Sequence, residues 1–595
     1  MATKMRKLIS KADEAIKYFM RIMRILASAG KLSLAAIWLL ALALGVIPSI
    51  SILVLQEIIN ILQTASQRYE YIVMLIIVYI GIDFLSGALG LATGYIENTL
   101  QMKAAITLDM SVLEKTKVLN LSDFEDSETY DLIQRAIGTG ISRMFSFFKS
   151  FVLILQSLVN LVMFSIILIS WKWWLLPVVF AMPIANTLVM AHFGKEQFVL
   201  QKSRTGKSRK QWYFQYLLSN DIAFKEIKTF NLGDYFRSKY KQIGLEFLKQ
   251  DRKLLNRRTR AQSILVVLDQ AISAAMFTFV IITAFMGDIL LGELVAYIRS
   301  ISNVKSSTQG LLSHVNSIYQ NVLYISQYFD FIDMKPDAVG PDDGMPIKEI
   351  PFIKIRNLSY KYKGKDDFAI RDMSVEIKGD SLVAFIGKNG SGKTTLVKIL
   401  SALYSDYEGD VYFGNQNLRD LNAEDVRKNI GILFQDYVKY ELSAKENVAF
   451  GQLEKLGDDD ALKQALFKTG MQDRISDLET QLGSWFENGE QLSGGEWLRV
   501  ALSRAFIRDA ELYLLDEPNS ALDSISERQI LKSFQELVKG KIGIIVSHRI
   551  ANIKSIVNQI IVFDNGSIDA SGTHDELLRT SEIYRELFEK ENNMS

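Results

Sequence analysis

Apolar residues are concentrated in the first half of the chain. Long apolar runs occupy much of residues 30–310, whereas residues 350–595 alternate short apolar runs with polar stretches. A helix needs about 20 apolar residues to cross the hydrocarbon core of a bilayer. Six segments reach that length, and a soluble core rarely needs six such helices in series. The pattern therefore predicts an α-helical transmembrane domain with spans at 33–55, 71–95, 151–170, 173–194, 261–285 and 288–310.

The charges around these segments predict their orientation. Before the first span, apolar residues recur at helical intervals between lysines and arginines, which indicates an amphipathic helix on the inner membrane surface. The connection 195–260 carries many basic residues, among them Arg257 and Arg258, and is expected in the cytoplasm. The two internal connections, 96–150 and 195–260, are long and rich in helix formers, so we expect the helices to continue into the cytoplasm.

Few charged residues fall inside the predicted spans. Asp83 lies in the second span and Asp269 in the fifth, while the polar sixth span contains Arg299 and Lys305. A charge at this depth costs about 2.5–3.5 kcal/mol on insertion scales and therefore needs a partner or a wet cavity. Two interpretations stay open for the aspartates, contact with a transported substrate or structural pairing. The basic pair either faces water or lies in a part of the helix that has left the membrane.

A change in composition marks the end of the membrane domain. Half of the eight prolines fall within residues 336–351, together with glycines and aspartates, which is typical of a linker. The transmembrane domain is therefore predicted at 1–335, with its amphipathic helix, six spans and cytoplasmic extensions. After the linker, short β-rich runs alternate with helical stretches over 352–595, which predicts an α/β domain with a mostly parallel sheet.

A phosphate-binding motif stands near the start of this second domain. In SLVAFIGKNGSGKTTLVKIL, an apolar strand runs into G-x-x-x-x-G-K-[ST] and then into a helical pattern. Glycines let backbone N–H groups close around phosphate oxygens at the start of the helix, and the lysine and threonine reach phosphate and Mg²⁺. The motif predicts ATP and Mg²⁺ as cofactors of a P-loop NTPase. Its nucleotide-binding residues are Gly387, Asn389, Gly390, Ser391, Gly392, Lys393, Thr394 and Thr395, with Thr394 also a metal ligand.

A second buried strand ends in two carboxylates. In ELYLLDEP the apolar run is followed by Asp516 and Glu517. The carboxyl end of a parallel strand faces the ligand site of such a sheet. We expect Asp516 to hold Mg²⁺ and Glu517 to orient or deprotonate the attacking water.

The bulk composition argues against several kinds of partner and site. The formal net charge of +1 gives no reason to expect a nucleic-acid partner. The chain has no cysteine, which excludes disulfides, thiol catalysis and metal sites that contain cysteine.

The ordered motifs together resemble the nucleotide-binding domain of an ABC transporter. They comprise the P-loop at 387–395, Gln435 in ILFQD, LSGGE at 492–496, LLDEP at 514–518, SALD at 520–523 and SHR at 547–549. A membrane domain followed by this ATPase is the exporter arrangement. The resemblance implies that Tyr362 stacks on adenine, that Gln435 ligates the Mg²⁺ site and couples it to the membrane helices, and that His548 contacts the γ-phosphate.

The LSGGE turn also points to a second subunit. A serine–glycine–glycine turn that opens a helix can bind an anion, yet the domain already has a P-loop. The resemblance implies that Ser493, Gly494 and Gly495 close over the ATP of the partner and that Asp523 lies at the dimer interface. Two positions depart from the usual pattern: Glu496 replaces a glutamine, and Asn519 replaces a threonine or serine. Since neither change removes a catalytic group, a homodimer with two working sites is favoured over a heterodimer with one inactive site.

Four further segments resemble the exporters of nisin-type lantibiotics. These segments are QWYFQYLLSNDIAFKEIKTFNL, LSDFEDSETYDLIQRA, ILFQDYVKYELSAKEN and TQLGSWFENGEQLSGGEWLRVALSRAF. The resemblance implies a multi-pass protein of the bacterial cytoplasmic membrane, with its ATPase domain in the cytoplasm. It would hydrolyse ATP to export a lanthipeptide precursor that still carries its leader, and modification enzymes are potential partners. The alternatives are a multidrug or lipid exporter of the same architecture and an ATP-regulated membrane protein that does not pump.

Overall fold

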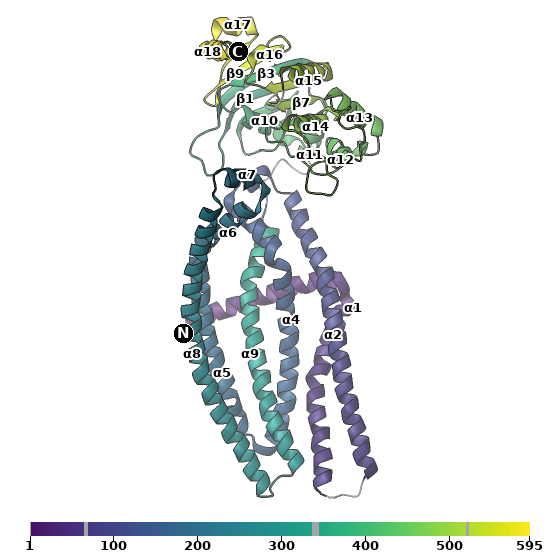
Figure 1. The fold of residues 1–595 in the computed structure, drawn as a ribbon, viewed down its shortest axis with the longest axis vertical. Coiled ribbons are helices and arrows are strands. Elements are labelled where there is room, and N and C mark those ends of the chain that lie inside the picture. The colour runs from purple at the N-terminus through teal and green to yellow at the C-terminus, as the bar shows by residue number, and fades with distance from the viewer. Residues whose placement is uncertain (1, 65–68, 336–343, 519–522, 595) are drawn as a thin grey trace. The chain divides into compact units, whose positions relative to one another are not determined.

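The computed structural model describes residues 2–64, 69–335, 344–518 and 523–594 (Figure 1). The chain divides into two compact units. The helical unit comprises residues 1–116 and 132–334, and the α/β unit comprises residues 117–131 and 335–595. The predicted linker at 336–351 lies partly outside the described residues, and the predicted domain boundaries remain predictions.

The helical unit is built from very long helices. These are α1 (Ala2–Gln63), α2 (Tyr69–Lys117), α4 (Ser127–Lys172), α5 (Leu175–Ser203), α8 (Gly233–Phe285) and α9 (Leu291–Asp333). Two shorter helices, α6 (Thr205–Ser219) and α7 (Asp221–Thr229), connect α5 to α8. The backbone leaves helical geometry at Gly30, so α1 consists of an N-terminal segment and a second helix that contains the first predicted span. Figure 1 shows the N-terminal segment lying across the direction of the other long helices.

Five of the long helices are apolar enough to cross a membrane. In the part of the chain that the structure describes, they are Ala15–Gln63, Tyr69–Lys117, Arg143–Lys172, Leu175–Ser203 and Gly233–Phe285. The predicted count of six spans is therefore not confirmed. The sixth predicted span coincides with the start of α9, where polar and charged residues lower the hydropathy. At 1.5 Å per residue, the 49 residues of α2 reach about 70 Å, more than twice the hydrocarbon thickness.

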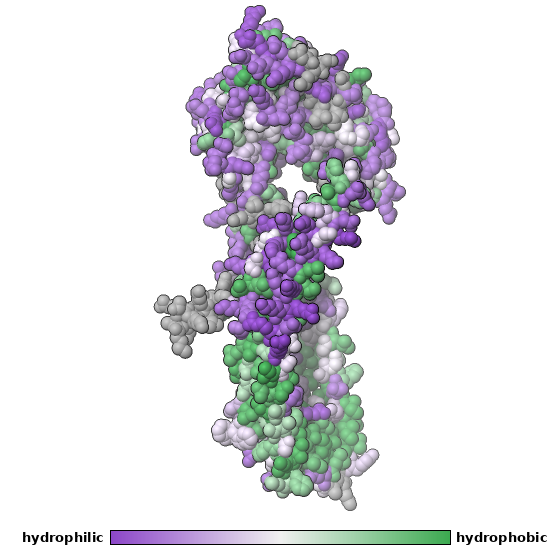
Figure 2. Space-filling model, turned by 60° about the vertical axis from the view of Figure 1, so that its left-hand side comes forward, coloured by the Kyte–Doolittle hydropathy of each residue, from purple (hydrophilic) through white to green (hydrophobic). Residues whose placement is uncertain are grey.

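The helical unit carries its apolar side chains outward. Figure 2 shows hydrophobic residues gathered on one stretch of its long helices, next to a hydrophilic stretch. On α2 the exposed side chains include Ile77, Phe84 and Leu91, which are 65%, 78% and 80% exposed. Such a surface is stable only against lipid or other protein, which agrees with a membrane-embedded domain.

Ion pairs bridge the long helices. Lys305 on α9 lies 2.5 Å from the carboxylate of Asp269 on α8, and its ammonium group also donates to the Ser273 hydroxyl at 3.0 Å. Only 17% and 18% of the Lys305 and Asp269 side chains are exposed. Glu97 on α2 pairs with Lys149 on α4 at 2.7 Å. The ion pair between Asp269 and Lys305 supports the structural interpretation of these two charges. Asp83 and Arg299, in contrast, are exposed on their helices.

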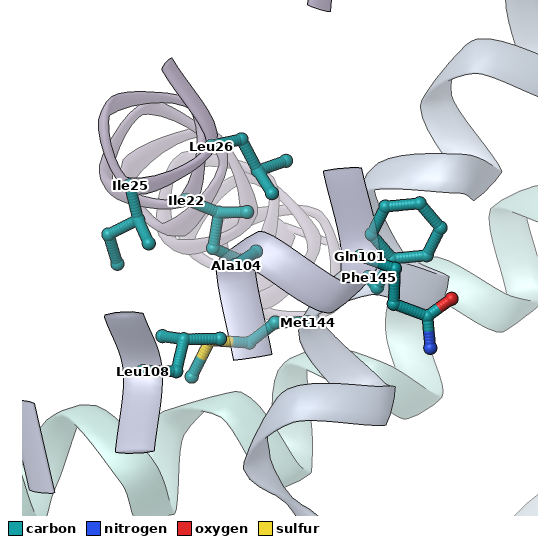
Figure 3. A pocket seen from close by; sticks show the side chains of 8 residues that line it. All are labelled: Ile22, Ile25, Leu26, Gln101, Ala104, Leu108, Met144 and Phe145. Atoms are coloured by element: carbon teal, nitrogen blue, oxygen red, sulfur yellow. The ribbon is translucent and has the colours of Figure 1, made fainter. Parts of the chain in front are cut away.

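The first helix also packs against α2 and α4. A small apolar cavity of about 10 Å³ remains where the three helices meet, with room for no more than one water molecule. Figure 3 shows its lining. The lining residues are Ile22, Ile25 and Leu26 of α1, Gln101, Ala104 and Leu108 of α2, and Met144 and Phe145 of α4. This cavity is a packing defect and is too small for a transported molecule.

The α/β unit contains two sheets. The larger has the strand order β10-β9-β3-β8-β7-β6, in which only β10 runs antiparallel to its neighbour. Its strands are β3 (Ser381–Gly387), β6 (Ile430–Leu433), β7 (Leu512–Asp516), β8 (Ile542–Val546), β9 (Gln559–Asp564) and β10 (Ser567–Gly572). The smaller, antiparallel sheet has the order β2-β1-β4-β5. It consists of β1 (Phe352–Tyr360), β2 (Ile370–Lys378), β4 (Glu408–Phe413) and β5 (Gln416–Asn417).

Helices complete the α/β unit around three apolar cores. They are α10 (Lys393–Leu400), α11 (Ala423–Lys428), α12 (Ala444–Ala449), α13 (Asp459–Lys468), α14 (Gly494–Phe506), α15 (Ser524–Leu537), α16 (Ile550–Ile553), α17 (His574–Thr580) and α18 (Glu582–Met594). One core lies between the two sheets and α10. A second joins the large sheet to α14, α15 and α18, and a third joins α12, α13 and α14. The central strands β3, β7 and β8 are fully buried, as the continuous apolar runs predict.

A short helix from the first cytoplasmic connection belongs to the α/β unit. This helix, α3 (Leu121–Glu125), ends in Glu125, whose carboxylate accepts hydrogen bonds from the buried Tyr404 hydroxyl at 2.8 and 2.9 Å. The ammonium group of Lys398 on α10 lies 3.3 Å from the same carboxylate. These contacts fasten the turn at 117–131 to the helix that follows the P-loop.

The Asp269–Lys305 pair gives a prediction for stability. Asp269→Ala or Lys305→Ala alone leaves one charge unpaired in an apolar surrounding, so each should lower the unfolding temperature of the purified protein in nanodiscs. The double variant removes both charges and should recover most of that loss, with a coupling of about 1–3 kcal/mol. Arg299→Ala, at an exposed position of the same helix, is the control. Additive losses in the double variant would contradict the pairing.

Candidate nucleotide site

Loops after four adjacent strands converge at one edge of the large sheet. The strands β3, β8, β7 and β6 lie side by side and run parallel, so their carboxyl ends share an edge. The P-loop follows β3, His548 follows β8, Glu517 follows β7 and Gln435 follows β6. Residues that are up to about 160 positions apart in the sequence therefore meet at one site.

The P-loop wraps tightly around the side chain of its own lysine. Gly392 has φ +101°, and a Cβ atom there would lie 2.8 Å from the carbonyl oxygen of Ala369, so only glycine fits. The ammonium group of Lys393 donates to the carbonyl oxygens of Gly387 and Lys388 at 2.9 Å each. Burial lowers the pKa of Lys393, while the nearby Glu517 and Asp516 carboxylates oppose that shift. The loop presents its glycines and a buried cation at the start of α10, as a phosphate site requires.

Glu517 joins two other residues of the site. Its Oε2 accepts a hydrogen bond from the side-chain amide of Gln435 at 2.7 Å, and its Oε1 lies 2.5 Å from His548 Nε2. The backbone of Glu517 has φ +50°, which is a strained conformation for a non-glycine residue, and its N–H donates to the carbonyl oxygen of Val546 at 3.0 Å. The three predicted catalytic residues are therefore in direct contact.

Asp516 has the surroundings of a metal ligand. The residue is fully buried, and neither carboxylate oxygen has a hydrogen-bond partner among the described residues. Burial raises the pKa of Asp516, against a smaller opposing effect of the nearby Thr394 hydroxyl. A buried carboxylate without partners is unfavourable unless a cation neutralises it. Among the described residues, no group of three or more His, Cys, Asp or Glu side chains is arranged to hold a metal ion.

Tyr362 is part of a cluster of three tyrosines beside the P-loop. Its hydroxyl forms a hydrogen bond with the Thr395 hydroxyl at 3.0 Å. Its ring lies edge-on to Tyr360 and Tyr404, with centroids 5.2 and 5.9 Å apart. The sequence interpretation missed Tyr404, because no motif surrounds it. Its contact with Glu125 makes it the link between this cluster and α3.

The LSGGE turn opens α14 with a capping box. The Ser493 hydroxyl accepts from the Glu496 N–H at 3.3 Å, and the Glu496 carboxylate accepts from the Ser493 N–H at 2.7 Å. The hydrogen bond from the Ser493 N–H to the Glu496 carboxylate lowers the pKa of Glu496, and the positive charge of Arg474 adds to this effect. Ser493 and Gly494 are exposed.

Asp523 caps the helix that follows it. Its carboxylate accepts from the N–H groups of Ile525 and Ser526 at 3.0 Å each, which stabilises the start of α15. The hydrogen bonds from Ser526 lower the pKa of Asp523. Asn519 and residues 520–522 of the SALD motif lie outside the described residues.

Two family models match the chain. The model for the ABC transporter transmembrane region matches residues 34–304, and the ABC transporter model matches residues 370–520. The second match contains the P-loop, Gln435, the LSGGE turn and the two carboxylates at the end of β7.

Individual relatives match nearly the whole chain. The subtilin transport ATP-binding protein of Bacillus subtilis is 34% identical over 93% of this chain and 90% of that protein. The nisin transport ATP-binding protein of Lactococcus lactis is 30% identical over 92% of this chain and 91% of its own. An ATP-dependent lipid A-core flippase of Francisella tularensis is 27% identical over 62% of this chain and 60% of that protein.

A solved structure shares the fold. A bacterial Atm1-family ABC exporter with ATP bound aligns with a TM-score of 0.75 and 19% identity, and covers 96% of this chain and 98% of its own. The chain therefore belongs to the ABC transporter family, as a membrane exporter in which a transmembrane domain is fused to an ATP-hydrolysing domain on the cytoplasmic side.

Proposed function

We propose that two copies of this chain form an exporter for a lanthipeptide precursor with its leader attached. The observation that carries the substrate class is the similarity over nine tenths of the chain to proteins named for subtilin and nisin transport. The lipid flippase matches less of the chain at lower identity. The modification enzymes that act on such a precursor are candidate partners at the cytoplasmic face.

The nucleotide is held by residues of both copies. In one copy the P-loop backbone at Gly387, Asn389, Gly390, Ser391 and Gly392 surrounds the phosphates, and Lys393 turns from its own loop carbonyls to the β and γ phosphates. Tyr362 stacks on the adenine, next to Thr395, to which its hydroxyl is bonded. Ser493, Gly494 and Gly495 of the other copy cover the γ-phosphate, and Asp523 lies where the two copies meet.

Three residues are the proposed Mg²⁺ ligands. Asp516, Thr394 and Gln435 would hold Mg²⁺, which supplies positive charge to the transferring phosphoryl group. The unpartnered buried oxygens of Asp516 support this assignment.

Hydrolysis depends on the contacts of Glu517. Its carboxylate accepts a proton from, or orients, the attacking water, while His548 on one side holds the γ-phosphate. Gln435, on the other side of the Glu517 carboxylate, would ligate the metal ion. Since both side chains lie against the Glu517 carboxylate, a change at the phosphate alters both loops together.

The transport pathway is assigned to a polar face of α9. Several of its exposed residues are spaced by three or four and so share one side of the helix. They are Arg299, Ser302, Ser306, Gln309 and Ser313. A polar face of this kind in an otherwise apolar bundle suits a wet cavity that accepts a peptide. Closing of the ATPase domains around ATP exposes this cavity to the outside, and hydrolysis returns it to the cytoplasm.

The substrate is tested by ATPase activity in nanodiscs, titrated with a leader-bearing lanthipeptide precursor. We expect saturable stimulation by the precursor and none by leaderless peptide or multidrug substrates. Stimulation by lipids or drugs, with the precursor inert, would favour the lipid or multidrug exporter instead. A rate that no candidate changes, together with no movement of peptide into inverted vesicles, would favour a membrane protein that does not pump.

The role of Glu517 gives a second prediction. Glu517→Gln keeps the hydrogen-bonding shape but cannot accept a proton, so it should bind ATP while hydrolysis falls at least about 100-fold. Glu511→Gln, before the other end of β7, is the matched control. Wild-type turnover by Glu517→Gln in a phosphate-release assay would remove Glu517 from this role.

The capping box of α14 gives a third prediction, for pH. The lowered pKa of Glu496 means that its charge stabilises the folded state above its unfolded pKa, and that this contribution disappears as pH falls through the folded value. Glu496→Gln should therefore lower stability by about 0.5–1 kcal/mol at neutral pH, and the difference should shrink below about pH 4. Unfolding curves of both proteins measure it, with the exposed Glu586→Gln as control. A difference that is constant with pH would argue against the cap.

A further inference from the structure

The loop that carries His548 is fastened on both sides of the histidine. On the N-terminal side, the Ser547 N–H donates to the carbonyl oxygen of Phe385 on β3 at 3.3 Å. On the C-terminal side, the Arg549 guanidinium donates to the Glu527 carboxylate at 2.7 Å, and Glu527 is only 1% exposed. Glu527 lies on α15, one helical turn after Asp523. The histidine thus stands between two anchored neighbours.

A third anchor comes from the C-terminal end of the chain. Glu591 on α18 accepts hydrogen bonds from the Ile550 N–H at 2.7 Å and from the Ala551 N–H at 3.2 Å. These two N–H groups begin α16 and have no partner within that helix. A carboxylate at this position satisfies both donors and interacts favourably with the positive end of the helix. Glu591 therefore fixes the backbone two residues after His548.

The helix that carries Glu591 is itself held in place. Tyr584 is fully buried, and its hydroxyl lies 2.8 Å from His574 Nδ1. The ammonium group of Lys554, which follows α16, lies 4.7 Å from the centre of the Phe588 ring. Phe588 also packs against His574, with ring centroids 5.0 Å apart. The contacts of α18 with α16 and α17 give Glu591 a defined position rather than that of a loose terminal side chain.

We infer that α18 positions the γ-phosphate histidine, and that Glu591 is the residue through which it acts. Glu591 holds the start of α16, Arg549 is held by Glu527, and His548 lies between these points and the Glu517 carboxylate, 2.5 Å from its Nε2. Loss of the cap lets the His548 loop move relative to Glu517 without changing the P-loop. This inference rests on the proposed role of His548 in hydrolysis.

The test uses basal ATPase activity of the full-length protein in nanodiscs, expressed per bound nucleotide. Glu591→Ala should lower kcat by about three- to tenfold, with KM for ATP changed less than about twofold. Glu591→Gln keeps an acceptor oxygen and should restore part of the rate. Glu589→Ala, exposed on the same helix, should behave as wild type. An unchanged kcat in Glu591→Ala, or a parallel loss of nucleotide binding and rate, would overturn the inference.

A double variant separates positioning from general stability. If Glu591 acts through His548, then Glu591→Ala should cause no further loss in a His548→Ala background, because the effects of residues in one unit are not additive. An independent loss in that background would contradict the inference. His548→Ala alone tests the proposed function: wild-type hydrolysis there would remove His548 from the reaction. If Glu591→Ala has normal activity while His548→Ala is inactive, the positioning role of α18 is wrong but the proposed role of His548 stands.

Discussion

The carboxylate of Glu517 joins three loops that leave the large sheet separately. It meets Gln435 after β6 and His548 after β8, and its own backbone is bonded to Val546 on β8. Its positive φ directs the side chain out of the strand end, where Asp516 remains buried behind it. Because β3, β8, β7 and β6 are adjacent and parallel, the loops that follow them lie at the same edge of the sheet. Because the Glu517 carboxylate contacts both Gln435 and His548, a shift of this carboxylate would move both loops.

A second feature of the chain is that the P-loop and the LSGGE turn are separate elements, and the proposed shared site needs one of each from different copies. Lys393 is buried within the P-loop, whereas the LSGGE turn is capped and exposes Ser493 and Gly494. In the proposed homodimer, self-complementary pairing of two copies would bring the P-loop of each copy opposite the LSGGE turn of the other. The contact of α3 with Tyr404 then ties the tyrosine cluster beside the P-loop to a connection between membrane helices.

The sequence predicted local features well because their causes are local. The strand–glycine–helix pattern identifies the P-loop, and the apolar strand before Asp516 and Glu517 gives their burial and position. The motifs named Glu517, Gln435 and His548 separately, and the structure places Gln435 and His548 against the Glu517 carboxylate. The sixth span is not confirmed, since apolar residues near 288–310 are mixed with Arg299 and Lys305.

Other features depend on residues far apart in the chain. Lys305 reaches Asp269 across two helices, and Tyr404 reaches Glu125 from a different domain of the sequence. Glu591 caps α16 from 41 residues away. No periodicity or motif marks such pairs, because each partner is an ordinary charged or aromatic residue until the fold is known. Asp523 also caps α15, a role that the SALD motif did not predict.

The central claim, a nucleotide site shared between two copies, is tested most directly by mixed pairs in a Glu517→Gln background. One copy carries Lys393→Ala and the other Ser493→Arg, each with its own affinity tag, and occluded ATP is measured in doubly tagged pairs. A shared site predicts that neither variant alone occludes ATP, but that mixed pairs occlude about one nucleotide, because one P-loop and one LSGGE turn remain intact opposite each other. Mixed pairs that occlude no more ATP than either variant alone would contradict the account.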